Sequence, residues 1–160
     1  MKVVKFGGSS VADAGQFQKV KAIINQDPQR QIVVISAAGK YGDATRKLTD
    51  TLYLIADGFE AGRDVTPLFA QVAARLEAIN QALHLHVPLI KLMNTIRHHI
   101  ATHYSRDYLV SRGEFLTAQL MAAYLGYTFV DAADLLFFDQ NGAIDEAKTL
   151  AAYRRLPRHH

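Results

Sequence analysis

A short apolar strand at the start of the chain runs directly into two glycines and two serines. Residues 3–6, Val-Val-Lys-Phe, have the β-branched and aromatic character of a buried strand. Gly7 and Gly8 end it with residues that accept positive φ and let backbone N–H groups approach an anion. Ser9 and Ser10 add hydroxyl donors, and the Lys5 ammonium would offset charge on a phosphoryl group held there. The stretch predicts a strand that delivers a phosphate-binding turn.

An ordinary flexible turn is the alternative interpretation of the same residues. In that case Gly7 to Ser10 only redirect the chain, and Lys5 is a solvated strand residue. Two other phosphate motifs are excluded, because the chain has neither a GxxxxGK loop followed by Ser or Thr nor a GxGxxG turn here. Taken alone, the glycine turn leaves both interpretations open.

The residues that follow predict a strand–helix–strand unit. Asp13, with Gln16 three positions later, is typical of a helix N-terminus, and apolar residues then recur at helical spacing up to Asp27-Pro28. Residues 31–36 form a continuous β-branched run, as expected for a strand covered on both faces. A right-handed crossover places both strand ends at one edge of a parallel sheet. We therefore expect Gly7-Gly8 beside Ser36-Ala37, where ligands gather in open α/β sheets.

The middle of the chain is predicted to be helical. A polar loop over residues 38–46 is followed by apolar stripes over 49–61, after Thr66-Pro67 and after Pro88, so residues 49–104 predict a helical insertion between strands. His99 and His103 have the spacing of two metal ligands on one helix. No cysteine and no nearby carboxylate completes such a set, so we interpret them as solvated histidines.

The last third predicts further alternation of strands and helices. We expect a strand over 108–111, a turn at 112–114, and a helix ending at Gly126. A strand over 127–130 comes next, and residues 135–144 predict a hairpin through Asn141-Gly142. Asp145 is expected to cap a last helix through Arg155.

Composition narrows the class of protein. At 160 residues, with 49% hydrophobic and 21% charged residues, the chain suits one compact globular domain. It has no cysteine, no secretion-type leader and no apolar run of about 18 residues, so we expect a cytoplasmic protein that does not contact a membrane. A net charge of +3 without a dense basic block argues against a nucleic-acid partner. Arg158-His159-His160 is interpreted as the remnant of an affinity tag.

Four blocks together resemble aspartate kinases, within the amino-acid kinase family. They are Lys5-Phe6-Gly7-Gly8-Ser9-Ser10; Val34-Ile35-Ser36-Ala37 with Thr49-Asp50; Ser111-Arg112-Gly113-Glu114; and Phe137-Phe138-Asp139 with Asn141-Gly142. The resemblance implies an α/β three-layer αβα sandwich with a mostly parallel sheet and a helical insertion at about 49–104. Residues 1–157 would be the N-terminal part of that catalytic domain, so the fold would be incomplete.

The resemblance also implies roles for individual residues. Lys5 would assist catalysis and, with Gly7, Gly8 and Ser9, hold the ATP phosphates. Ser36, Ala37, Thr49 and Glu114 would line the aspartate pocket, and no residue is assigned to a metal. Thr49 is preferred to Thr45 as the substrate threonine because Thr-Asp followed by Leu52 fits the pattern better. For Glu114, a surface carboxylate in the first turn of a helix is the alternative.

The implied function is that of an N-terminal aspartate kinase fragment. The complete enzyme would use ATP with Mg²⁺ to phosphorylate the β-carboxylate of L-aspartate, the first step toward lysine, threonine and methionine. Motifs that follow in the family are absent from residues 1–160, so we expect the chain alone to be inactive and to self-associate as a homo-oligomer. A kinase for glutamate or N-acetylglutamate, and a non-catalytic binding or assembly module, are the alternatives.

Overall fold

The computed structural model describes residues 1–42 and 46–156, in two compact units. The first unit is Met1–Gly126 and the second is Tyr127–His160. The class is α/β, as predicted, with parallel strands and helices in the first unit. Within the described ranges, no helix combines the length and the apolar character that a membrane crossing requires.

The first unit begins with the predicted strand–helix–strand arrangement. Strand β1 (Lys2–Phe6) leads through the short 3-10 helix η1 (Gly8–Val11) into α1 (Ala14–Asn25), and β2 (Arg30–Ile35) returns parallel to β1. Asp13 caps α1, because its Oδ1 accepts a hydrogen bond from the N–H of Gln16 at 2.8 Å. In the register, Val3 lies opposite Ile32 and Phe6 opposite Ile35. Within the described residues the sheet has these two strands, which end at the same edge.

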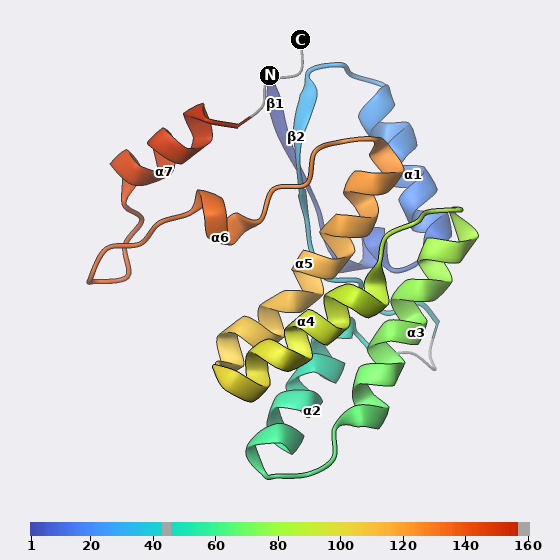
Figure 1. The fold of residues 1–160 in the computed structure, drawn as a ribbon. Helices are drawn as coiled ribbons and strands as arrows, with labels where there is room; N and C mark the ends of the chain where they lie inside the picture. Colours follow the sequence, from blue (N-terminus) through green and yellow to red (C-terminus); the bar gives the residue numbers. More distant parts are fainter. Residues whose placement is uncertain (43–45, 157–160) are drawn as a thin grey trace. The chain divides into compact units, whose positions relative to one another are not determined.

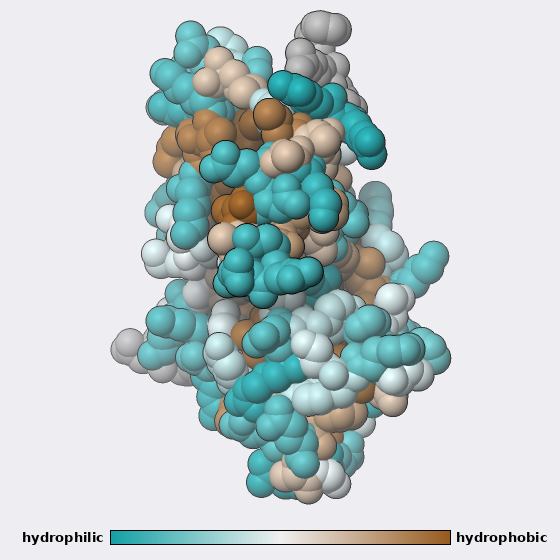
Figure 2. All heavy atoms as spheres, turned by 90° about the vertical axis from the view of Figure 1, so that its left-hand side faces the viewer, coloured by the Kyte–Doolittle hydropathy of each residue, from teal (hydrophilic) through white to brown (hydrophobic). Residues whose placement is uncertain are grey.

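The two faces of this sheet differ in burial. Phe6, Val33 and Ile35 belong to the face packed against the core, where β2 contacts helix α5 (Arg106–Leu125). On the other face, Val3 is 62% and Val34 44% exposed. Figure 2 shows apolar residues, coloured brown, exposed among polar ones on the face that it draws. A strand surface with apolar residues left in water is one that a further element could cover.

Helices occupy the predicted range 49–104. They are α2 (Leu48–Glu60), α3 (Thr66–Ala82) and α4 (Leu89–Thr102), with prolines at the start of α3 and just before α4. Figure 1 shows them gathered beyond the C-terminal ends of the two strands. Their apolar stripes are buried, including Leu52, Leu76 and Ile96. The stripes therefore build the core of the unit, as their spacing predicted.

The two histidines with i, i+4 spacing lie at the C-terminal end of α4, with His99 in the last turn and His103 at the C-cap. The ring of His99 lies against those of Tyr108 and His103, with centroid distances of 4.1 and 5.9 Å. In the described part of the chain, no group of three or more His, Cys, Asp or Glu residues is arranged to hold a metal ion.

The expected strand at 108–111 and turn at 112–114 are wrong, because α5 is one continuous helix from Arg106 to Leu125. Ser105 caps it by accepting a hydrogen bond from the N–H of Tyr108 at 3.2 Å. Leu109, Leu116 and Leu120 are fully buried along one side of it, which is a helical period. Gly113 lies inside the helix, and Gly126 at its C-cap is left-handed with φ 73°, as a C-terminal glycine often is.

The second unit contains two short helices, α6 (Ala132–Leu135) and α7 (Glu146–Arg154). The expected strand at 127–130 does not form. The hairpin is reduced to one antiparallel bridge between Phe138 and Ile144. The turn itself is present, because Asp139 Oδ1 accepts hydrogen bonds from the N–H groups of Asn141 and Ala143 at 2.8 and 3.0 Å. Local side-chain bonds of this kind replace a strand ladder. Asp145 caps α7 as predicted.

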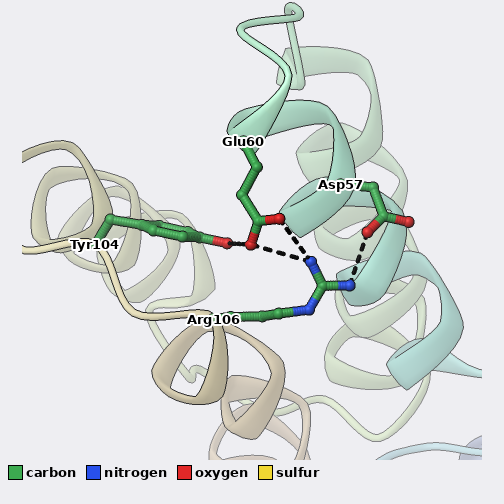
Figure 3. A network of polar contacts seen from close by, with 4 residues as sticks. All are labelled: Asp57, Glu60, Tyr104 and Arg106. Atoms are coloured by element: carbon green, nitrogen blue, oxygen red, sulfur yellow. Dashed lines mark hydrogen bonds and ion pairs between the residues drawn. The ribbon is translucent and has the colours of Figure 1, made fainter.

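A network of polar side chains joins the end of α2 to the start of α5 (Figure 3). Arg106 donates hydrogen bonds to both carboxylate oxygens of Glu60 at 3.0 Å and to Asp57 at 2.7 Å. The Tyr104 hydroxyl donates to Glu60 at 2.5 Å. The bonds from Tyr104 and Arg106 lower the pKa of the Glu60 carboxyl, whereas desolvation and Glu60 raise the pKa of Tyr104 to about 12. All four side chains remain substantially exposed, so this is a surface network.

Candidate active site

The two turns that follow β1 and β2 lie against each other. The N–H of Gly39 donates a hydrogen bond to the carbonyl of Gly8 at 2.8 Å, and the N–H of Ser36 donates to that of Phe6 at 3.2 Å. The predicted closeness of Gly7-Gly8 to Ser36-Ala37 is therefore confirmed. It follows from the parallel register, which brings both strands to an end at the same edge.

The glycines are needed here for close approach rather than for a left-handed turn. A Cβ on Gly39 would lie 2.6 Å from the carbonyl carbon of Gly8, and a Cβ on Gly8 would lie 3.0 Å from the carbonyl oxygen of Ala37. Gly7 has φ −75°, and neither Gly7 nor Gly8 is among the described glycines with positive φ. The freedom of glycine to take positive φ is therefore not used at Gly7 or Gly8. Two backbones touch where side chains would separate them.

A pocket of about 390 Å³ opens beside this contact. It brings together residues from both turns, from the start of α2 and from the middle of α5. Its lining residues are Gly8, Ser9, Ser36, Ala37, Ala38, Gly39, Lys40, Lys47, Thr49 and Glu114. The residues predicted for an aspartate pocket and two of those predicted for phosphates therefore share one cavity. Their individual roles stay predictions.

Lys5 and Gly7 are not among the residues that line this pocket. Gly7 is exposed immediately before η1, and Lys5 is exposed on β1 opposite Val34, on the face of the sheet turned away from the core. No ion pair or hydrogen bond joins the Lys5 side chain to another described residue. Thr45, the alternative to Thr49, lies outside the described residues.

Glu114 reaches the pocket because α5 packs unusually close to its neighbours. A Cβ on the adjacent Gly113 would lie 2.9 Å from Cβ of Ala37 and 3.0 Å from Cδ1 of Leu52. Glu114 lies more than two turns inside α5, which begins at Arg106. The first-turn part of the alternative is therefore wrong, because the helix dipole acts mainly within that turn. Its surface part is confirmed, because Glu114 is exposed.

Thr117 ties α5 to the second turn and was missed by the sequence analysis. Its side chain is fully buried; Oγ1 donates a hydrogen bond to the carbonyl of Gly113 at 2.7 Å and accepts one from the N–H of Ala38 at 3.2 Å. Its only sequence signal is its position four residues after Gly113, which indicates a contact between them only when both residues lie in one helix.

Charges around the pocket suit a zwitterionic ligand. Lys40 and Lys47 contribute two ammonium groups and Glu114 one carboxylate, while Ser9, Ser36 and Thr49 bring hydroxyls. Lys40 and Lys47 were also missed, although both stand in the glycine-containing loop after the second strand. The set can bind a molecule that carries carboxylates together with one ammonium group.

A larger hollow of about 760 Å³ lies on the α3–α4 side of the first unit. Its lining includes Glu77, Pro88, Ile90 and His98, and none of the predicted site residues. The smaller pocket is the stronger candidate because it alone combines the glycine turns with charged and hydroxyl groups.

Comparison with known proteins supports the resemblance found in the sequence. The amino acid kinase family model matches residues 1–157. Aspartokinase 3 of Bacillus subtilis is 38% identical over 141 residues, covering 82% of this chain and 30% of that protein.

Two solved structures share the fold. Aspartate kinase of Clostridium acetobutylicum superposes with a TM-score of 0.89 at 37% identity, over 96% of this chain and 35% of that one. Aspartokinase III of E. coli, solved in complex with aspartate and ADP, gives 0.75 at 26% identity, over 98% and 38%. The chain thus spans about a third of the length of the relatives it matches, and it belongs to the amino acid kinase family, in which it is similar to the aspartokinases.

Proposed function

We propose that residues 1–157 are the N-terminal part of an aspartate kinase catalytic domain, which transfers the γ-phosphoryl group of ATP to the β-carboxylate of L-aspartate. One observation carries the proposal. The glycine turn after β1 and Glu114 from α5 share one pocket, although they are far apart in the chain. A site that joins phosphate-binding and ammonium-binding groups fits a kinase for an amino acid.

In this proposal the pocket holds aspartate by its three charges. The Glu114 carboxylate pairs with the α-ammonium group, and Lys40 and Lys47 face the two carboxylates. Hydroxyls of Ser36 and Thr49 fix the orientation of the acceptor carboxylate by hydrogen bonds. Such positioning matters because phosphoryl transfer is catalysed mainly by alignment and charge stabilisation.

The phosphates of ATP would lie on Gly7, Gly8 and Ser9, with the Lys5 ammonium offsetting the charge on the transferred group. Support comes from the exposed, unpaired Lys5 side chain two residues before the turn, within the described structure. Magnesium accompanies ATP in this chemistry, but the pocket offers one carboxylate, Glu114, which is assigned to the substrate. These residues therefore do not form a magnesium site by themselves.

The aspartate and ADP bound to the E. coli aspartokinase III structure support both substrates by similarity of fold. For the chain alone we expect no aspartate-dependent ADP release, because it covers about a third of its relatives. Aspartate-dependent turnover by the chain, abolished in Lys5→Met, would show that these residues suffice for catalysis.

Binding of free amino acids tests the pocket directly. We expect ¹⁵N–¹H NMR titration to give L-aspartate shifts centred on residues 36–40 and around Glu114, with weaker or no response to L-glutamate and N-acetyl-L-glutamate. Glu114→Gln should weaken L-aspartate binding by about tenfold, the effect of losing one charge-assisted hydrogen bond. Asp107→Asn, which removes an exposed carboxylate from the same helix, is the matched control. Stronger binding of N-acetyl-L-glutamate, which lacks the ammonium group, would contradict the assignment of Glu114.

A further inference from the structure

Arg75 on α3 donates hydrogen bonds to the backbone of three separate segments. Its Nη1 donates to the carbonyl of Arg46 at 2.6 Å, and its Nη2 donates to the carbonyls of Gly39 and, at 3.4 Å, of Ala12. These carbonyls come from the end of the first turn and from both described ends of the loop after β2. A planar guanidinium can reach several acceptors at fixed angles, which an ammonium group cannot.

Each of these segments contributes to the candidate active site. Gly39 lines the pocket and touches Gly8, and Arg46 immediately precedes Lys47, which also lines it. Ala12 follows η1, the short helix that begins at Gly8. Arg75 itself is not part of the lining. Its contacts therefore act behind the pocket wall, on the backbone that shapes it.

The surroundings of Arg75 differ from those of an ordinary surface arginine. The side chain is half-buried, and desolvation lowers the pKa of its guanidinium. The ring of Tyr41 lies 5.5 Å from the guanidinium carbon, and the buried Nε has no acceptor among the described residues. A charge removed from water in this way is costly unless its hydrogen bonds compensate. The backbone carbonyls supply that compensation here.

We propose that Arg75 is a positioning residue of the site: it holds the backbone of the two turns together, so that Lys40 and Lys47 face the pocket that Glu114 also lines. This inference rests on the proposed function for the ligand, an amino dicarboxylate, but its structural part does not. Arg75 acts through Gly39 and Arg46 and touches no substrate.

The experiment compares Arg75→Met and Arg75→Lys with Arg97→Met in the full chain. Arg97 is a matched control, because it also donates to another helix, to Thr66 Oγ1 at 3.0 Å, and lies over an aromatic ring, Phe69, but lines no part of the pocket. Two quantities are measured: backbone amide hydrogen exchange at residues 39–42 and 46–47, and the L-aspartate dissociation constant.

We expect Arg75→Met to speed exchange in both loop segments by about tenfold or more and to weaken L-aspartate binding by a similar factor. Arg75→Lys should resemble Arg75→Met, because its ammonium cannot serve the separate carbonyls together. Arg97→Met should change neither quantity. If Arg75→Met does not fold, Arg75→Lys is compared with Arg97→Met in its place.

Unchanged loop exchange and unchanged aspartate affinity in a folded Arg75 variant would overturn the inference. So would a lower melting temperature with no local change in exchange, because Arg75 would then contribute only to general stability. If the wild-type chain binds no aspartate, the proposed function fails instead. The exchange measurement then decides by itself whether Arg75 holds the two turns.

Discussion

The first unit is held together in two different ways on its pocket side and at the outer end of α2. On the pocket side, Gly8, Gly39 and Gly113 let backbones and helices approach with no side chain between them. At the outer end of α2, Asp57, Glu60, Tyr104 and Arg106 join the same two helices, α2 and α5, through exposed polar groups.

This difference shows which contacts determine the geometry of the site. The energy of a close-packed, buried contact changes sharply with distance, because there is no empty space for added atoms. Exposed ion pairs tolerate movement, and water and salt weaken them. The positions of Glu114 and of the two turns should therefore depend on the glycines much more than on the polar network.

Gly39→Ala should have the largest effect. The added Cβ would lie 2.6 to 2.8 Å from the backbone atoms of Gly8 and Ser9, which cannot rotate away as a side chain could. We expect a loss of stability at the upper end of the overpacking range of about 1–3 kcal/mol. Urea unfolding followed by circular dichroism measures it.

Gly7→Ala is the control for that measurement, because a Cβ on Gly7 meets nothing within 4 Å and its φ of −75° suits alanine. We expect its free energy of unfolding to stay near the wild-type value. Equal losses in the two variants would mean that glycine flexibility, and not close contact, is what matters in these turns.

Gly113→Ala should have an intermediate effect. Its Cβ would lie 2.9 Å from Cβ of Ala37, which is fixed to the backbone, and 3.0 Å from Cδ1 of Leu52, which can yield by a few tenths of an ångström. Overpacking of about 1–3 kcal/mol is partly offset by the helix propensity of alanine, worth about 1 kcal/mol. We expect a modest loss of stability but a clear loss of L-aspartate affinity, because Glu114 moves with the helix. If the L-aspartate affinity of Gly113→Ala falls only as far as its loss of stability explains, the close packing at Gly113 does not determine the geometry of the site.

Arg106→Met should have a smaller effect, and one that depends on salt. It removes the exposed bonds to Asp57 and Glu60 but no packed core group. We expect a slight decrease in melting temperature at low salt that fades as salt is added, with aspartate affinity unchanged. A salt-independent loss as large as that of Gly39→Ala would place this network among the contacts that determine the fold.

Titration of Tyr104 should produce the smallest effect on stability. Its pKa is raised to about 12 from 10.0, so folding favours the protonated phenol. The contribution of Tyr104 to the free energy of unfolding is therefore complete below pH 10 and is lost as the pH rises through about 12. The difference in tyrosinate absorbance between wild type and Tyr104→Phe measures the pKa. A midpoint near 10 would show that the hydrogen bond to Glu60 does not persist in solution.

The strand–helix–strand start of the chain was predictable because its signals are local. Asp13 caps α1 as its spacing with Gln16 indicates, and the β-branched run of β2 has no competing helical pattern. The meeting of Gly8 with Ser36 and Ala37 then follows from the direction of parallel strands. For the same reason, the predicted pocket residues after the two strands lie close together.

The first half of helix α5 was mispredicted because Gly113 is required by a tertiary contact and not by a local turn. Ser111-Arg112-Gly113-Glu114 resembles a turn in isolation, and only the closeness of Ala37 and Leu52 shows why a glycine stands inside a helix. Residues 127–130 have the composition of a strand but are not assigned to one in the described structure, since β-propensity depends on tertiary context more than on the residues themselves.

Gly39, Thr117 and Arg75 were missed for a related reason. Each contacts a residue at least thirty positions away, such as Gly8, Ala38 or Gly39, and no local pattern announces such a contact. A glycine in a loop, a threonine in a helix and an arginine on a helix surface are all common. Their importance appears only once the elements are packed together.

The contact between Gly8 and Gly39 also limits how substitutions in this site can be rescued. A larger residue at 113 can be accommodated by trimming Ala37 or Leu52, because the obstacles there are side-chain atoms of these two residues. At position 39 the obstacle is the backbone of Gly8 and Ser9, and Gly8 already lacks a side chain to trim. In a genetic selection, suppressors of Gly113→Ala should therefore be recovered at positions 37 and 52. Gly39→Ala should be repaired only by reversion.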